Sequence, residues 1–481
     1  MSVSTTAAPG APVADRPQGA AQDAPQGATQ GRSPWAGARA RSVSWLPDAA
    51  VVATVAWWAT YLTWGTGGRE PHVLSIGCLL LVAAIVTVRP WRVLPPLATV
   101  PAHAVGLAAL AVVLTAPTGW AGGDDAASYA FAAELGLVLL AWARTPGRRL
   151  LLLTGVLGAA GAQFALGWLP WWGRQDPMKL FEGTFYWHNQ AGIFLAAGAV
   201  LGLGAIAAGR PVALLGWTVT PLCVAGTVFT TSRGSQMALA LAVVLLLVLL
   251  RRRHLHVLGG LALAWGVTVA LSGPPFFTER IAPTAATQAR AASLVGNGVQ
   301  RIEDWRRAFR IFEHWPFSGA GFNSFASATD VATTRHDRVG TAFAHNGYLQ
   351  AAADGGLVLI VPLVVLLALV LLAALRGLPG AVRSRDAVRL GALCTLVALL
   401  LHSGMDFDWG YPALLAMLAP VAVLALPPAV APATPSTSAA RRAPSWVGPW
   451  VGPALAVLGI GLLVLGAVAG WGGGLDLNAP V

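Results

Sequence analysis

The sequence predicts an all-α fold, a polytopic bundle of about 12 to 13 transmembrane helices with a partly helical loop outside the membrane. Three observations predict it: 56% of the 481 residues are hydrophobic and only 11% charged, long apolar runs recur, and arginines gather in alternate short loops. The expected partner is a lipid bilayer. Because the basic residues behind the net charge of +11 are dispersed among these loops, no nucleic-acid partner is expected.

Apolar runs of roughly 17 to 25 residues, the length that crosses ~30 Å of hydrocarbon, follow one another along the chain. They predict thirteen spans, give or take one, near 48–64, 73–88, 93–115, 126–143, 149–169, 190–209, 212–229, 235–250, 255–271, 347–375, 387–402, 411–427 and 451–470.

The chain divides by composition into a membrane domain and polar ends. Residues 1–44 are rich in Ala, Gly, Pro, Gln and Ser and are expected to form a disordered cytoplasmic tail without a cleavable signal peptide. The membrane domain is expected over 45–427. A cytoplasmic linker over 428–450, a last span over 451–470 and a short tail over 471–481 complete the prediction.

Loop charge orients the spans, because short cytoplasmic loops carry an excess of Lys and Arg. With the N-terminus inside, the cytoplasmic loops hold fifteen arginines and the short outer loops hold four basic residues, Arg69, Arg174, Lys179 and Arg233. This alternation predicts a multi-pass protein of the cytoplasmic (inner or plasma) membrane, with the long loop 272–346 extracytoplasmic. A helix is expected within that loop over 301–312, ended by Pro316 and the Gly319-Ala320-Gly321 turn.

Two arginines on the predicted outer side are candidate anion ligands. Arg233 stands in a tight polar turn between two apolar helices, and its guanidinium is suited to two phosphate oxygens. The alternative is an interface anchor without a ligand. Arg301 shares a helical stripe with Trp305 and is a candidate for the other half of a diphosphate, the alternative being a salt bridge with Glu303 or Asp304.

His345 and Asn346 come just before the span that begins near Tyr348. Histidine exchanges a proton near neutral pH, which suits the activation of a hydroxyl group, although a merely hydrogen-bonded interface histidine is the alternative. Asp354 is expected two turns or so inside that span, where an acid is costly. The Gly355-Gly356 pair there favours close helix packing.

Further polar residues stand where spans meet the outside: Asn189, after Glu182 and His188, and the pair His402 and Asp406. They are candidates for supporting or sugar contacts, with helix capping and the aromatic belt as alternatives. Cys78, Cys223 and Cys394 are too far apart for a disulfide framework or a zinc site and are expected to be packing residues.

Taken together, these residues resemble the O-antigen ligase and polymerase superfamily over roughly 180–410. The order is Gly183-Thr184-Phe185 with Asn189 and Ala191-Gly192, then Thr231-Ser232-Arg233-Gly234, then Arg301 with Trp305, Pro316 and Gly319-Ala320-Gly321, then His345-Asn346 with Gly356. Leu357-Val358-Leu359-Ile360 depart from the family, which often has a glycine or hydroxyl residue there, and the N-terminal spans show no match.

The resemblance implies a GT-C-like membrane glycosyltransferase that works without a metal or other cofactor. The implied donor is a glycan on an undecaprenyl-diphosphate carrier, and the acceptor is a hydroxyl of a glycan, lipid or protein. His345 would be catalytic, Arg233 and Arg301 would bind the diphosphate, and the anomeric configuration would invert. Asn346, Asp354, Trp305, Asn189, His402 and Asp406 would support them.

A transporter or flippase of lipid-linked glycans is the alternative from another class. Transporters usually carry internal repeats and place charged residues near the bilayer midplane. No repeat is visible, and the polar residues gather at the outer face, which favours the enzyme; Glu134, inside the fourth span, is the exception.

Overall fold

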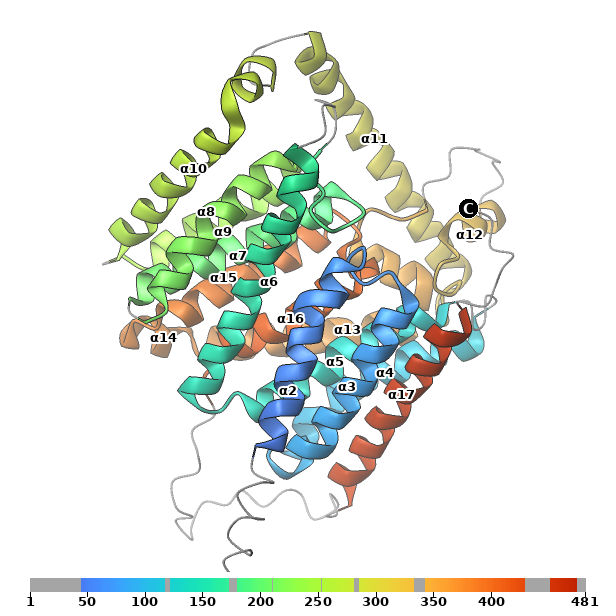
Figure 1. Cartoon of the computed structure of the whole chain (residues 1–481). Helices are drawn as coiled ribbons and strands as arrows, with labels where there is room; N and C mark the ends of the chain where they lie inside the picture. The colour runs from blue at the N-terminus through green and yellow to red at the C-terminus, as the bar shows by residue number, and fades with distance from the viewer. Residues whose placement is uncertain are drawn as a thin grey trace, which may run out of the picture. The chain divides into compact units, whose positions relative to one another are not determined.

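The computed structural model describes residues 45–116, 122–172, 180–209, 211–251, 253–280, 285–332, 342–428 and 450–473. Within these ranges every long element is a helix and no strand occurs, which confirms the all-α fold (Figure 1). The predicted disordered tail over 1–44 and most of the linker over 428–450 lie outside the described residues.

Each predicted span corresponds to a helix. These are α2 (Leu46–Trp57) with the π-helical turn η1 (Trp58–Leu62), α3 (Pro71–Val88), α4 (Pro96–Thr115), α5 (Gly123–Trp142), α6 (Pro146–Trp172), α7 (His188–Ala208), α8 (Ala213–Phe229), α9 (Arg233–Leu249), α10 (His254–Arg280), α13 (Gly347–Arg376), α15 (Ala387–Ser403), α16 (Pro412–Ala425) and α17 (Val451–Gly473).

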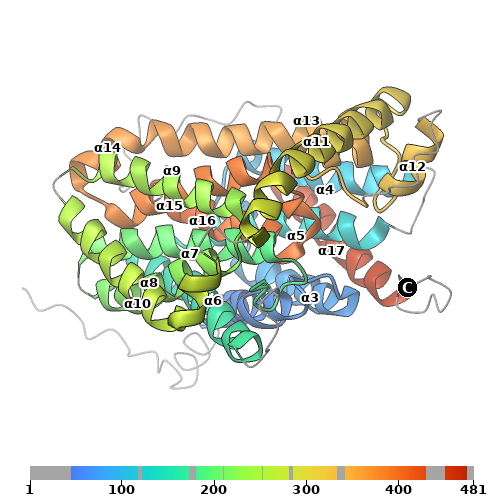
Figure 2. The ribbon, with the colours of Figure 1, turned by 90° about the horizontal axis from the view of Figure 1, so that it is seen from above.

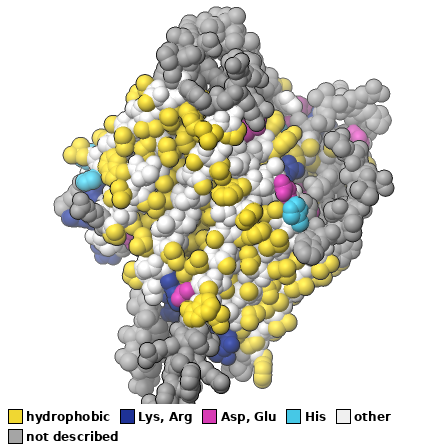
Figure 3. Space-filling view, in the orientation of Figure 1, with side chains coloured by type: hydrophobic (Ala, Val, Ile, Leu, Met, Phe, Trp, Pro, Cys, Tyr) yellow, Lys and Arg dark blue, Asp and Glu magenta, His cyan; other side chains and the backbone are white. Residues whose placement is uncertain are grey.

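Eight helices of the described chain are long and apolar enough to cross a membrane, and α8, α9, α15 and α16 are apolar but shorter. The face in Figure 3 agrees with this character, because hydrophobic side chains cover α2, α3, α6 and α8 while the few charged ones lie near helix ends. The protein is therefore a multi-pass membrane protein.

The loop predicted over 272–346 is largely helical. It begins with the end of α10 and continues through α11 (Ala285–His314) and α12 (Phe325–Ala332). The helix expected over 301–312 is confirmed as the second half of α11. In both Figure 1 and Figure 2, α11 and α12 lie beside the first turns of α13.

Helix α7 forms the centre of the bundle and is almost entirely buried. Its small residues permit close contacts on several sides. At its crossing with α15, a Cβ added to Gly204 would lie 2.8 Å from the carbonyl oxygen of Ala387 and 3.0 Å from the Cα of Gly391. The two backbones touch there, as small residues allow between membrane helices. The contact keeps α15, which carries His402, in register with α7, which carries Asn189.

Helix α13 consists of two helical pieces. Gly356, at φ 55° and ψ −155°, interrupts it, and a Cβ there would lie 2.4 Å from the carbonyl oxygen of Phe317. Gly356 therefore has a second role besides the predicted close packing. It adopts a positive φ, and the left-handed region favours glycine.

The loop after α11 fills this interruption. The N–H groups of Leu357 and Val358 donate to the carbonyls of Pro316 (2.8 Å) and Phe317 (3.1 Å), and those of Ala320 and Gly321 donate to Ala353 and Asp354 (both 2.9 Å). Backbone groups freed by a helix break must find partners where water is scarce. Residues 316–321 supply them.

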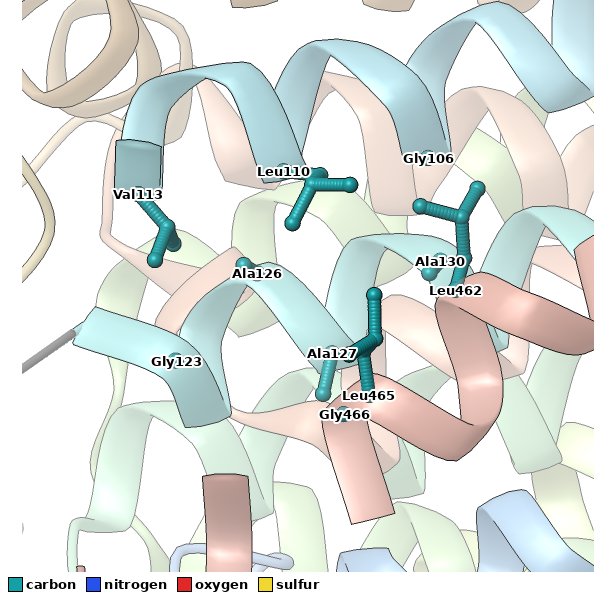
Figure 4. A pocket seen from close by; sticks show the side chains of 10 residues that line it. All are labelled: Gly106, Leu110, Val113, Gly123, Ala126, Ala127, Ala130, Leu462, Leu465 and Gly466. Atoms are coloured by element: carbon teal, nitrogen blue, oxygen red, sulfur yellow. The ribbon is translucent and has the colours of Figure 1, made fainter. Parts of the chain in front are cut away.

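A small apolar pocket lies between α4, α5 and α17 (Figure 4). Its wall combines small residues such as Gly106 and Gly466 with Leu110 and Leu462. Nearby, Glu134 of α5 is buried and lies 2.6 Å from His103 of α4. The acid that stood out in the sequence thus has a partner within the helix pair.

Helix ends that the sequence predicts on the same side of the membrane contact one another in the structure. At one end, Thr184 donates to the carbonyl of Thr63 (3.0 Å) and Asn189 to Asp406 (2.7 Å). At the opposite end, Arg149 donates to Leu424 (2.7 Å) and Arg389 to Ala425 (2.9 Å). The first of these ends, called the His345 end below, contains the candidate site residues.

Candidate functional site

Asp406, in the loop between α15 and α16, is the centre of the polar cluster. Its side chain is only 2% exposed. One carboxylate oxygen lies 3.2 Å from Nδ1 of His345 and accepts the N–H of Phe407 at 2.9 Å. The other accepts from Arg301 at 3.3 Å and from Asn189 at 2.7 Å. Three segments far apart in sequence therefore meet on one carboxylate.

The charge of Asp406 is stabilised by these neighbours. Burial alone would raise the pKa of Asp406, but the hydrogen bond with His345 and the positive charges of His402, Arg301 and His345 lower that pKa to about 2. Asp406 is therefore ionised at neutral pH and has no proton to donate. It follows that the hydrogen in the contact with His345 sits on the imidazole Nδ1.

His345 is held on both sides of its backbone. It adopts a left-handed conformation with φ 48°, and the indole N–H of Trp305 donates to its carbonyl at 3.4 Å. Its Nδ1 faces Asp406, whereas no hydrogen bond reaches its Nε2 from the described part of the chain. In the neutral form of the imidazole with Nδ1 protonated, Nε2 would carry the lone pair that accepts a proton.

Asn346 fixes the start of α13. Its side-chain oxygen accepts the N–H groups of Tyr348 (3.0 Å) and Leu349 (3.1 Å), which makes it the helix N-cap, and its amide donates to the carbonyl of Gly404 (2.8 Å). The N–H of Gly347 also donates to the carbonyl of Asp406 at 2.9 Å. Asn346 thus positions His345 against the 404–406 loop rather than facing a substrate itself.

Arg301 extends from α11 to the same loop. Besides the carboxylate of Asp406, its guanidinium donates to the carbonyl of Met405. The alternative partners are engaged elsewhere, because Glu303 pairs with Arg306 and Asp304 with Arg307. The Arg301 side chain as a whole remains 34% exposed.

A second histidine–aspartate pair, His402 with Asp408, lies next to Asp406. Nδ1 of His402 is 2.7 Å from the carboxylate of Asp408, and its Nε2 is 3.2 Å from the hydroxyl of Ser235. Ser235 also donates to the carbonyl of Asn189 at 3.1 Å. Because His402 is buried with both ring nitrogens engaged, it connects α9, α7 and α15 and does not face an open site.

Arg233 lies at the first turn of α9, next to this pair. Ser232 caps the helix by accepting the N–H of Ser235, which turns the Arg233 side chain outward, and Arg233 is exposed. No described residue forms an ion pair or hydrogen bond with its guanidinium. Its neighbour Gly234 approaches His402 so closely that a Cβ would lie 3.1 Å from the imidazole Nε2. Arg233 is therefore an unpaired cation at the rim of the same cluster.

Asp354 does not contact His345 directly. It is buried near the break of α13 and accepts from Gln350 at 2.9 Å, while the Gln350 oxygen accepts the N–H of Ala344 at 2.7 Å. Asp354 thus steadies the residue before His345 through one intermediate side chain.

Three supporting residues were not foreseen: Asp408, Gln350 and Arg69. Arg69 stacks over the rings of Phe343 (5.3 Å) and Tyr411 (5.4 Å), and Phe343 lies parallel to Phe407 at 4.0 Å. A second acid two residues after Asp406 was the only sequence signal for Asp408. Nothing in the sequence links Arg69 to the 343–411 aromatic group.

The three predicted principal residues thus lie at one end of the bundle, in one polar cluster with Asp406. Of the candidate supporting residues, Trp305, Asn346 and Asn189 contact the cluster or its backbone, and His402 lies beside it. Asp354 is linked to it only through Gln350. A cation at the rim, a cation held on a carboxylate and a histidine with a free Nε2 can stabilise an anion and accept a proton within one site.

Comparison with known proteins identifies one segment. A family model described as O-antigen ligase matches residues 219–364, which include Arg233, Arg301 and His345. No curated protein matches the chain. Residues 219–364 are thus similar to the O-antigen ligase family, in the segment that carries all three principal candidate residues.

Proposed function

We propose that the protein is a glycosyltransferase that moves a glycan from an undecaprenyl-diphosphate carrier to an acceptor hydroxyl at the outer face of the cytoplasmic membrane. The match of residues 219–364 to the O-antigen ligase family supports an enzyme of glycosyltransferase type in a multi-pass membrane protein. The carrier, the metal independence and the inversion rest on the resemblance of the residues above to that superfamily.

The observation that carries the proposal is the pairing of His345 with ionised Asp406. A general base must present a free lone pair within reach of the acceptor, and the contact between Nδ1 and Asp406 leaves Nε2 in that state. Trp305 and Asn346 hold the surrounding backbone, so the imidazole is oriented before substrate binds.

The proposed reaction is an in-line displacement. The acceptor oxygen bonds to the anomeric carbon of the donor glycan while its proton passes to Nε2 of His345. The bond from the anomeric carbon to the diphosphate oxygen breaks, and undecaprenyl diphosphate leaves with the electron pair. Attack from the face opposite the leaving group inverts the anomeric configuration.

Arg233 and Arg301 are the proposed ligands of the departing diphosphate. Negative charge grows on the leaving oxygen, and guanidinium groups stabilise such charge through fixed donors. Arg301 is already oriented by Asp406 and Met405, whereas Arg233 has its full donor set available. The two arginines also keep the diphosphate at the His345 end.

The test is a transfer assay in cells. The gene is deleted and replaced by the wild type or by His345→Ala, Arg233→Ala or Arg301→Ala, and both the surface glycan and the accumulated undecaprenyl-diphosphate-linked glycan are quantified. We expect the His345 variant to lose transfer by about 100-fold or more and each arginine variant by a similar factor. The carrier-linked glycan should accumulate.

Matched controls remove the same residue types elsewhere on the described surface. His254→Ala, at the opposite end, and Arg310→Ala, on α11 away from the loop, should transfer at the wild-type rate. Wild-type transfer by His345→Ala would refute the base, and wild-type transfer by both arginine variants would refute the diphosphate site.

A further inference from the structure

A cavity at the end opposite His345 is lined by four arginines. It opens to the surface and lies where the C-terminal end of α9 meets the short helix α14 (Leu378–Ser384). Arg251 and Arg253 line it from the turn after α9, and Arg383 and Arg385 from α14 and its C-cap. Figure 3 shows dark blue side chains at the left edge, where α10 begins and α14 lies.

None of the four arginines forms an ion pair with an acid in the described ranges. Arg253 donates to the carbonyl of Ala207 and Arg383 to that of Pro379 (3.3 Å), which fixes the side chains but leaves their charges uncompensated. Asp386, the nearest acid in sequence, instead accepts the N–H of Arg389 at 3.1 Å as the N-cap of α15. Four like charges around one space favour an anion between them.

Exposed arginines can be solvated by water and do not by themselves require a ligand. The apolar side chains of the same cavity therefore indicate which kind of ligand fits. Val248, Leu250 and Val382 line the same cavity as the arginines. A soluble anion is not stabilised by contact with these apolar side chains. A molecule with both an anionic group and a hydrocarbon part satisfies both halves of the lining.

An exposed apolar stripe leads from this cavity along α9. Met237, Leu241, Val244 and Val248 recur at helical spacing, and each is at least 50% exposed. Val248 belongs to both the stripe and the cavity. Eleven residues of helix rise about 16 Å, which is roughly half the hydrocarbon thickness of a bilayer, or one leaflet.

We propose that the cavity binds the phosphate of an anionic phospholipid whose acyl chain lies along the Met237–Val248 stripe. Basic pockets between membrane helices bind lipid phosphates in this way. The site is independent of glycosyl transfer, because no residue of it lies in the cluster around Asp406. It would attach the α9–α14 side of the bundle to the leaflet opposite the His345 end.

The experiment compares bound lipids by native mass spectrometry. The full-length protein is reconstituted with an equimolar mixture of phosphatidylglycerol and phosphatidylcholine that carry identical chains. We expect wild type to retain phosphatidylglycerol preferentially. The triple variant Arg251→Gln, Arg383→Gln, Arg385→Gln should bind it about 100-fold more weakly, at roughly fivefold per charge near a membrane surface.

The matched control removes three arginines from the same end but outside the cavity: Arg89→Gln, Arg92→Gln, Arg144→Gln. It should retain phosphatidylglycerol as wild type does. Equal retention by the cavity variant and wild type overturns the proposal, as does equal loss in both triple variants, which would reflect general surface charge.

Two further comparisons distinguish a bound phospholipid from a bound soluble anion. Val248→Gln leaves all four arginines in place and should weaken retention of phosphatidylglycerol, whereas Leu107→Gln on the exposed face of α4 should not. Glycerol phosphate should not raise the melting temperature at concentrations where short-chain phosphatidylglycerol does. Equal stabilisation by both compounds overturns the lipid assignment in favour of a soluble phosphate.

Discussion

At the scale of single residues, the site depends on one carboxylate serving several partners. His345, Arg301 and Asn189 all contact Asp406, so the charge of Asp406 orients a base and a cation at once. A sequence shows Asp406 as one acid among 20 acidic residues, and only the fold reveals that three distant segments share it.

Replacing Asp406 with Asn tests that shared role. The amide has nearly the same shape, but its neutral oxygen attracts Arg301 less and no longer favours the Nδ1–H form of His345. We expect glycan transfer to fall by about 100-fold while the protein remains in the membrane. Asp330→Asn on α12, an exposed acid outside the cluster, should transfer normally; a wild-type rate for Asp406→Asn would contradict the proposed orientation of His345.

The lowered pKa of Asp406 predicts an acid-dependent stability. In the folded protein this pKa is about 2, below the value near 4 of an unfolded chain, so the carboxylate contributes stability above pH 4 and loses it as pH falls toward 2. The difference between the folded and the unfolded pKa of Asp406 corresponds to about 2 kcal/mol of folding stability. Thermal unfolding in detergent should therefore show a steeper fall between pH 4 and 2 for wild type than for Asp406→Asn. Parallel curves would refute the assignment.

At the scale of elements, helix spans and their order could be predicted because apolar length and loop charge are local signals. Helix α13 shows the limit. The Gly355-Gly356 pair indicated packing, but the interruption at Gly356 depends on carbonyls of residues 316 and 317, and no local pattern connects those segments. The same reason explains why Asp408 and Arg69 were missed, since their roles arise from partners on other helices.

Gly356→Ala should disturb this junction. A Cβ would lie 2.4 Å from the carbonyl of Phe317 and would occupy a left-handed conformation, which together cost about 1 to 3 kcal/mol. We expect a lower melting temperature and reduced transfer, because the first piece of α13 begins beside His345. Gly461→Ala on α17, where a Cβ meets nothing within 4 Å, is the control. Equal melting temperatures for the two variants would argue against the strained junction.

The crossing of α7 and α15 predicts a second packing effect. Leu at position 204 would have to displace the backbone of α15 near Ala387 and Gly391, which lies on the helix that carries His402. Overpacking of this kind costs about 1 to 3 kcal/mol. Gly204→Leu should lower the melting temperature, and Gly158→Leu, at an open position on α6, should not. Comparable melting temperatures would show that the crossing can relax.

At the scale of the whole molecule, the orientation in the membrane is a prediction from charge alternation, and it is directly testable. Ser327→Cys on α12 should react with a membrane-impermeant maleimide in intact spheroplasts, whereas Arg92→Cys, at the opposite end, should react only after permeabilisation. The native Cys78, Cys223 and Cys394 are buried and should contribute little background. The reverse labelling pattern would invert the topology and place the proposed transfer on the cytoplasmic side.

The main-chain bonds between residues 316–321 and the interruption of α13 bear on how this enzyme can diversify. Main-chain bonds are indifferent to most side-chain identities, so the exposed surfaces of α11 and α12 can change in sequence while His345 keeps its place. A chimaera that exchanges only exposed residues of those helices between related chains should therefore keep His345 in its position.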